Sequence, residues 1–270
     1  MQDDSNMIMI FQSLPGDITE DLKNERINAI KLRFKKIKQK LSLKAVKHEN
    51  FWSYKQDFPS GNKQRIQKIS FDIEKQTLPN IKDYDSLESN LKDLIKILEQ
   101  KKQNDVHIMR GLKIVQCLAE ILKKPAVCPK SEIKNLGKNL ELVIKVLMYF
   151  SSIIENRNYM VVTNRMTVIA DLLMWVLNKP SKIPLGISFL PDLIHLIIIH
   201  IKHRIPFEYL SMKDDFVEYL FLSNILIKFK QKYTSLQGPI DLTSGFGSLS
   251  LVLLKSLGMI EALTSQLNIK

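Results

Sequence analysis

The stretch IKLRFKKIKQKL, residues 30–41, contains six lysine and arginine residues and no acidic residue. Its large apolar residues, together with one preceding residue, recur in steps of three and four: Ile27, Ile30, Phe34, Ile37 and Leu41. Residues at this spacing lie on the same side of a helix. The stretch therefore predicts an α-helix with one narrow apolar seam, and we expect the lysine and arginine side chains to occupy the remaining faces.

The positive charge of the whole chain is concentrated around this stretch. The 270 residues carry a formal net charge of +12. Residues 23–68 contain about 14 lysine and arginine residues against about three acidic residues, so almost all of the excess lies there. A general compositional bias toward lysine would spread the excess along the chain. The distribution instead predicts a basic N-terminal arm attached to a nearly neutral body.

Helical patterns fill the rest of the sequence, and we find no convincing alternating strand pattern. The arm contains a second helical stretch with Ile66, Ile69 and Ile73 on one face. Beyond it, helices are predicted over residues 85–102, 106–123, 131–155, 160–177, 187–202, 212–233 and 248–267. The prolines fall between these patterns, as expected for residues that interrupt helices. We expect Asp85 to cap the helix that it opens, with Glu88 completing a capping box. The chain belongs to the all-α class.

Breaks in these patterns predict three segments. A flexible leader spans residues 1–22, and a basic amphipathic helical arm spans residues 23–78. An α-helical domain then spans residues 79–270. With 45% hydrophobic residues, the chain has ample material for a core.

Three segments start with a small or polar residue, continue with apolar residues and end rich in leucine. They are GLKIVQCLAEIL (111–122), NRMTVIADLLMWVL (164–177) and LGMIEALTSQL (257–267). They resemble the third helix of an armadillo repeat, in which small residues allow close stacking. The resemblance implies an armadillo/HEAT-like helical stack, and such stacks commonly present a long concave binding surface.

The order of segments carries a second resemblance. QRIQKISFDIEK (64–75) and SLESNLKDLIKILE (86–99) precede the helical domain, and KQKYTSLQGPIDLTSGFGSLSLVLLKSLGMIEALTS (230–265) closes it. This arrangement resembles the C-terminal region of the family of S-phase cyclin A-associated proteins in the endoplasmic reticulum. The resemblance implies a non-enzymatic adaptor that works in the cytoplasm through protein and ribonucleoprotein contacts, associated with ribosomes or the surface of the endoplasmic reticulum.

The basic arm is the main candidate for a binding site. Its candidate residues are cations that could neutralise an acidic partner and aromatic residues that could stack on unpaired bases: Lys31, Arg33, Lys35, Lys36, Lys38, Lys40, Lys44, Lys47, Trp52 and Tyr54. Four interpretations stay open at this point. The arm is a solvated helix packed on the body, it binds RNA or a ribonucleoprotein, it binds an acidic protein, or it lies on a membrane surface.

Other sites are not favoured by the sequence. His195, His200 and His203 are not spaced for one helix face, and no neighbouring cysteine or glutamate completes a zinc site, so we expect no metal and no cofactor. Asp214 and Asp215 are adjacent, and we expect them at a helix start, where they favour the helix dipole. No Ser/His/Asp or Cys/His residues have the spacing of a catalytic set, so we expect a protein that is not an enzyme.

Membrane insertion and secretion are also not expected. The apolar stretch 183–201 is interrupted by prolines and by Asp192, and a central aspartate strongly opposes insertion into a bilayer. The opening residues MQDDSNMIMIF are acidic where a signal peptide carries cations. Cys117 and Cys128 are expected to be free thiols in a reducing, cytoplasmic environment.

Overall fold

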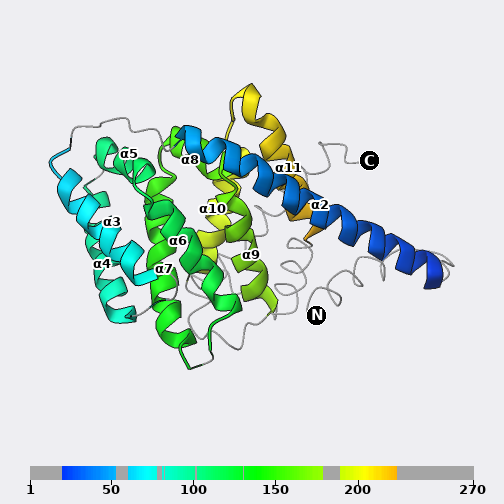
Figure 1. Cartoon of the computed structure of the whole chain (residues 1–270), viewed down its shortest axis with the longest axis horizontal. Helices are drawn as coiled ribbons and strands as arrows, with labels where there is room; N and C mark the ends of the chain where they lie inside the picture. The colour runs from blue at the N-terminus through cyan, green and yellow to red at the C-terminus, as the bar shows by residue number, and fades with distance from the viewer. Residues whose placement is uncertain are drawn as a thin grey trace, which may run out of the picture.

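The computed structural model describes residues 20–52, 60–77, 81, 83–100, 102–129, 131–178 and 189–223. These residues form ten α-helices and two short 3-10 helices without any β-strand (Figure 1), which confirms the all-α prediction. The α-helices are α2 (Glu20–Trp52), α3 (Lys63–Thr77), α4 (Tyr84–Leu98), α5 (Gln103–Gly111), α6 (Ile114–Lys123), α7 (Ile133–Phe150), α8 (Ile154–Val162), α9 (Arg165–Asn178), α10 (Leu190–Lys202) and α11 (Leu210–Leu222). The 3-10 helices are η1 (Lys124–Ala126) and η3 (Phe207–Tyr209).

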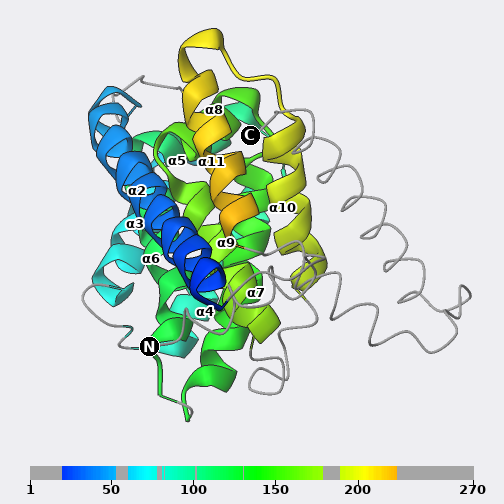
Figure 2. The same ribbon diagram turned by 90° about the vertical axis from the view of Figure 1, so that its right-hand side faces the viewer.

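The helices pack around one interior. Helix α4 lies against α7, α6 contacts α3, α7 and α9, and α10 contacts α7 and α9. The long helix α2 crosses the outside of α8 and α11, and its N-terminal end extends past the other helices (Figures 1 and 2). The first and last helices of the described residues are therefore in contact, because α11 packs on α2, which ends more than 150 residues earlier.

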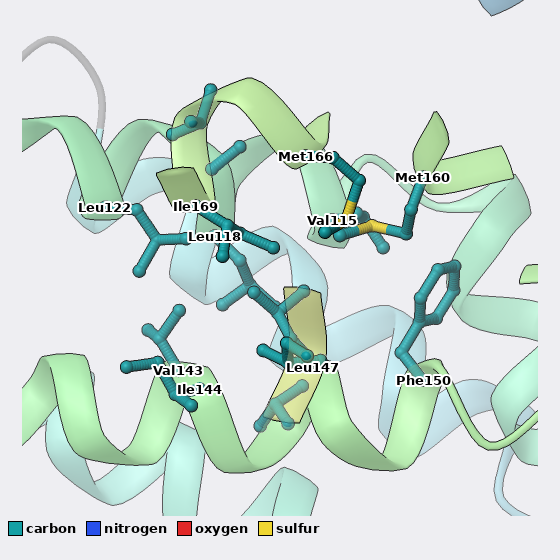
Figure 3. Packing of buried hydrophobic residues seen from close by; sticks show 14 of the residues in the cluster. Val115, Leu118, Leu122, Val143, Ile144, Leu147, Phe150, Met160, Met166 and Ile169 are labelled. Carbon is teal, nitrogen blue, oxygen red and sulfur yellow. The ribbon is translucent and has the colours of Figure 1, made fainter. Parts of the chain in front are cut away.

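A continuous hydrophobic cluster joins α2 through α11. Figure 3 shows part of it, where Leu118 of α6, Leu147 of α7 and Ile169 of α9 point into a common space. Each of these three side chains is almost completely buried. Burial of a side chain of this size contributes about 1.5–3 kcal/mol. The interior is therefore the principal source of stability for the fold.

Helix α3 belongs to this interior. Ile66, Ile69 and Ile73 are buried, as their shared face predicted, and α3 packs on α4 and α6. The boundary predicted near residue 79 thus falls between two helices of the same hydrophobic cluster.

Three of the predicted helices are divided in the structure. The stretch 160–177 is split between α8 and α9, where Asn164 has a positive φ of 58°. The stretch 106–123 is split where Leu112 adopts an extended conformation, with φ −99° and ψ 141°. The stretch 131–155 is split where α7 ends at Phe150 and Ile153 is extended, with φ −97° and ψ 135°. Because helical periodicity resumes after each break, the apolar spacing gives little sign of the interruption.

The predicted cap of α4 was wrong by two residues. Asp83, rather than Asp85, is the N-cap, and its carboxylate accepts hydrogen bonds from the backbone N–H groups of Asp85 and Ser86 at 3.0 and 3.1 Å. The extended conformation of Asp83 places its side chain over the first turn, and Asp85 lies inside that turn. The leader predicted over residues 1–22 was wrong for residues 20–22, which begin α2, and residues 1–19 lie outside the described part. The helix predicted at 248–267 also lies outside it.

We predict that Leu41→Ala lowers the free energy of unfolding by about 2–5 kcal/mol, because Leu41 is only 1% exposed at the contact of α2 with the body. Leu43→Ala on the same helix is the control, since that side chain is 63% exposed. Urea denaturation followed by circular dichroism measures both changes. Equal midpoints for the two variants would contradict the packing of α2 on the body.

Candidate functional site

The apolar seam of α2 faces the helical body, which was one of the interpretations that the sequence left open. Ile37 and Leu41 are buried, and Ile30 and Phe34 are half-buried against the cluster. The ring of Phe34 stacks on the ring of Tyr219 in α11, with 5.0 Å between their centroids and 24° between their planes. The seam is therefore occupied by this chain and is not exposed for a partner.

Asp215 of α11 binds two lysines of α2. Lys40 Nζ donates to Oδ1 at 2.6 Å, and Lys44 Nζ donates to Oδ2 at 2.8 Å. The side chain of Asp215 is only 8% exposed, whereas those of Lys40 and Lys44 are 52% and 29% exposed. A buried carboxylate needs such partners, because its desolvation is otherwise costly.

Two further carboxylates hold α2 in place. Arg33 forms an ion pair with Glu218 of α11. Lys38 Nζ lies 3.3 Å from Oδ2 of Asp171 in α9, whose other oxygen accepts a hydrogen bond from the hydroxyl of Tyr219. Four of the eight cations proposed for partner binding thus pair with carboxylates of the same chain, which favours the interpretation of α2 as a helix packed on the body.

The other candidate residues have different surroundings. Lys35, Lys36 and Lys47 are exposed and form no ion pair within the ranges that the structure describes. Lys31 is half-buried. Trp52 ends α2 but its side chain is outside the described part, and Tyr54 lies outside it entirely. The predicted site therefore divides into cations that fix α2 and cations that face solvent.

A shallow depression of about 400 Å³ runs along α2 beside the solvent-facing cations. Its lining consists of Lys36, Gln39, Lys40, Leu43, Lys44 and Lys47. Steps of three or four residues connect Lys36 through Leu43 to Lys47, so the lining forms one stripe along the helix. The stripe combines positive charge with an exposed leucine.

A second, larger groove lies between α4, α5, α7 and α10. Its volume is about 890 Å³, which is in the range of ligand pockets. The apolar part of its lining consists of Ile95, Leu98, Val106, Leu142, Met148, Tyr149 and Ile153. Lys92, Lys96 and Lys145 also line the groove, together with Glu99 and Asp192. The groove suits an apolar ligand surface with a charged margin.

The three lysines of this groove have local ion-pair partners. Lys92 lies 2.5 Å from Glu88, and Lys96 lies 3.1 Å from Asp93 on α4. The hydrogen bond from Lys92 lowers the pKa of Glu88. These pairs are exposed helix pairs and contribute only a few tenths of a kcal/mol each. They leave the lysines available to a second acidic group.

The histidines of α10 do not form a metal site. His200 is completely buried, and its Nδ1 donates to the carbonyl of Leu196 at 2.7 Å. Burial lowers the pKa of His200 to about 4. His203 instead lies 2.9 Å from Asn158 through Nε2, while His195 is exposed. Across the described ranges, no three His, Cys, Asp or Glu side chains are grouped to hold a metal ion.

The surroundings of the two cysteine thiols make them weak nucleophiles. Cys117 and Cys128 are both free, and burial raises the pKa of each. The hydroxyl of Tyr84 donates to Glu132 at 2.7 Å beside Cys128, and burial followed by this hydrogen bond raises the pKa of Tyr84. A protonated thiol next to a carboxylate does not promote nucleophilic attack.

Similarity to known proteins gives no indication of the function of this chain. No protein-family model, curated protein or solved structure matches it. Within the described residues, no helix combines the length and apolar character needed to cross a bilayer. The α2 stripe and the groove between α4 and α7 are therefore the two candidate binding surfaces.

Sequence reasoning missed the carboxylates that bind α2. Asp171, Asp215 and Glu218 lie in α9 and α11, far along the sequence from their cationic partners. Asp215 was expected to act on the dipole of its own helix, but it lies in the second turn of α11 and binds Lys40 and Lys44. Its position one turn before Glu218, with both on one side of α11, was the available signal.

We predict that Asp215→Asn lowers the free energy of unfolding by about 1–3 kcal/mol, because the amide cannot accept hydrogen bonds from both lysines. Asp214→Asn is the matched control, since Asp214 is exposed and adjacent. Chemical denaturation of both variants measures the difference. An equal, small effect of the two substitutions would show that the Asp215 pairs do not stabilise the fold.

We predict that His200 makes stability depend on pH. Its pKa is about 4 in the folded protein, against about 6.5 in an unfolded chain, so the unfolded state takes up the proton first as pH falls. Below about pH 6.5 and down to about pH 4, this residue should lower the free energy of unfolding by about 1.4 kcal/mol per pH unit. His200→Phe should have a correspondingly flatter profile in urea denaturation across this range. Parallel profiles would exclude this role.

Proposed function

We propose that the chain is a non-enzymatic adaptor that binds a helix of a protein partner in the groove between α4 and α7. The observation that supports this proposal is the apolar lining of a groove of about 890 Å³ that remains open among well-packed helices. Amphipathic helices bind such grooves through residues spaced three and four positions apart. The charged edges then set the orientation of the bound helix.

An armadillo/HEAT-like arrangement of the body is part of this proposal. Two of the segments that resemble armadillo third helices correspond to α6 and α9, and these two helices pack on each other. Contact between equivalent helices is what neighbouring repeats of a solenoid provide. The third such segment lies outside the described residues.

Helix α2 provides a second contact in this proposal. Lys35, Lys36 and Lys47 face solvent, so α2 can approach an acidic partner while its seam remains on the body. RNA or ribonucleoprotein binding by α2 is the alternative. The free thiols of Cys117 and Cys128 support a cytoplasmic setting for either activity.

The groove is tested by selecting helical peptides from a display library against the full chain and measuring their affinity by fluorescence anisotropy. We predict that Leu142→Glu weakens the selected apolar helices at least about tenfold, because the carboxylate lies in the groove lining. Val127→Glu is the matched control, since Val127 is 78% exposed and is not among the residues of the groove.

Circular dichroism of both variants checks that they are folded. The proposal is wrong if no helical peptide is selected, or if the selected peptides bind both variants as tightly as the unaltered chain.

A further inference from the structure

The outward face of α2 carries aliphatic side chains that the body does not use. Leu32, Leu43 and Val46 are 54%, 63% and 65% exposed. The seam of the same helix is already buried, with Leu41 only 1% exposed. Helix α2 therefore has two apolar sides, and only one of them has a partner within the part of the chain that the structure describes.

Lysines accompany these aliphatic residues. The depression of about 400 Å³ on this face begins at Lys36 and ends at Lys47, with Leu43 between them. At 1.5 Å per residue, this stripe is about 16 Å long, or about three helical turns. Its length and straightness match a helix laid along α2 better than a compact ligand.

We infer that the outward face of α2 binds an acidic amphipathic helix of a partner protein. This inference deepens the proposed adaptor function and depends on it. The leucines of such a helix would cover Leu43 and Val46, and its carboxylates would pair with Lys36 and Lys47. Apolar contact with matching charges at the margin is how amphipathic helices recognise one another.

The ion pairs of α2 leave space for these carboxylates. Lys40 binds Asp215, yet its side chain remains 52% exposed. An ammonium group has three donors, so Lys40 can keep Asp215 and donate to a second carboxylate from the solvent side. A partner would thus extend the existing charge network without displacing α2 from the body.

The composition of the face favours a protein helix over nucleic acid. Single-stranded nucleic acid is bound by cations together with aromatic rings on which bases stack. Of the α2 side chains that are described, Phe34 is packed against Tyr219, and the large apolar side chains that are exposed are all aliphatic. Leucine and valine offer apolar area but no stacking surface.

The same face disfavours a second copy of the chain. A symmetric contact through α2 would bring the lysines of both copies together, and the chain carries a net charge of +12. Like charges brought close across an interface cost several kcal/mol. The partner must therefore supply acidic residues, which residues 26–48 of α2 lack.

The test uses four probes with the full chain. They are a 20-residue peptide with leucine at alternating three- and four-residue spacing and glutamate elsewhere, the same residues scrambled, a 20-nucleotide single-stranded RNA, and phosphatidylserine vesicles. Fluorescence anisotropy and co-sedimentation at about 150 mM salt give the affinities. We expect the amphipathic peptide to bind at least about fivefold more tightly than its scrambled form and more tightly than RNA or vesicles.

Substitutions then locate the site. Lys36→Glu with Lys47→Glu should weaken the amphipathic peptide at least about tenfold, and Leu43→Ser about threefold or more. Lys134→Glu with Lys138→Glu is the matched control on exposed positions of α7, with the same change of net charge and an expected effect below about twofold.

Each remaining outcome overturns the inference. If RNA or vesicles bind more tightly than the amphipathic peptide, the face binds those ligands instead. If the control variant loses as much peptide affinity as the Lys36/Lys47 variant, the loss reflects only the change of net charge. Leu142→Glu should leave this peptide unaffected, because that residue lies in the other groove. If no peptide binds the groove but the acidic peptide still binds α2, only the proposed role of the groove is wrong. If a peptide binds the groove but the acidic peptide does not bind α2, only the present inference is wrong.

Discussion

Binding of two lysines of α2 by the buried carboxylate of Asp215 is the interaction that fixes α2 on the helical body. Without Asp215 and its neighbour Glu218, Arg33, Lys40 and Lys44 would lose their carboxylate partners. Of the ion pairs of α2 described above, only that of Lys38 with Asp171 would remain. The carboxylates let the apolar seam of α2 approach α11 closely, and Phe34 then stacks on Tyr219. This placement leaves Lys35, Lys36 and Lys47 facing solvent.

Charge and apolar area on α2 therefore serve two purposes. One side of the helix completes the hydrophobic cluster and binds carboxylates of α9 and α11. The opposite side combines lysines with exposed aliphatic residues. The α4–α7 groove is a separate surface, and α5 and α10 also contribute to its lining. Two contacts of different chemistry suit an adaptor, because together they can distinguish one partner from many helical sequences.

Local pattern predicted much of the fold. The spacing of Ile37 and Leu41 identified the buried side of α2, and Ile66 and Ile73 did the same for α3. The breaks at Leu112 and between α7 and α8 were not predicted, since a short extended segment leaves the apolar spacing almost unchanged. Sequence spacing reports which side of a helix is apolar, but it does not report which other helix will cover that side.

The site was predicted less completely for the same reason. The cations of α2 were visible as a group, but their division into paired and solvent-facing members depends on carboxylates in α9 and α11. The α4–α7 groove likewise combines residues from 92 to 192, so no single stretch of sequence contains it. Both features arise only when distant helices are brought together.

Hydrogen–deuterium exchange followed by mass spectrometry is the most direct test of the central claim that α2 is fixed to the body. Backbone amides of residues 34–46 should exchange as slowly as those of α11, since the two helices share one interface. Exchange of residues 34–46 within seconds, while α4 and α7 stay protected, would show an independent arm and contradict the account.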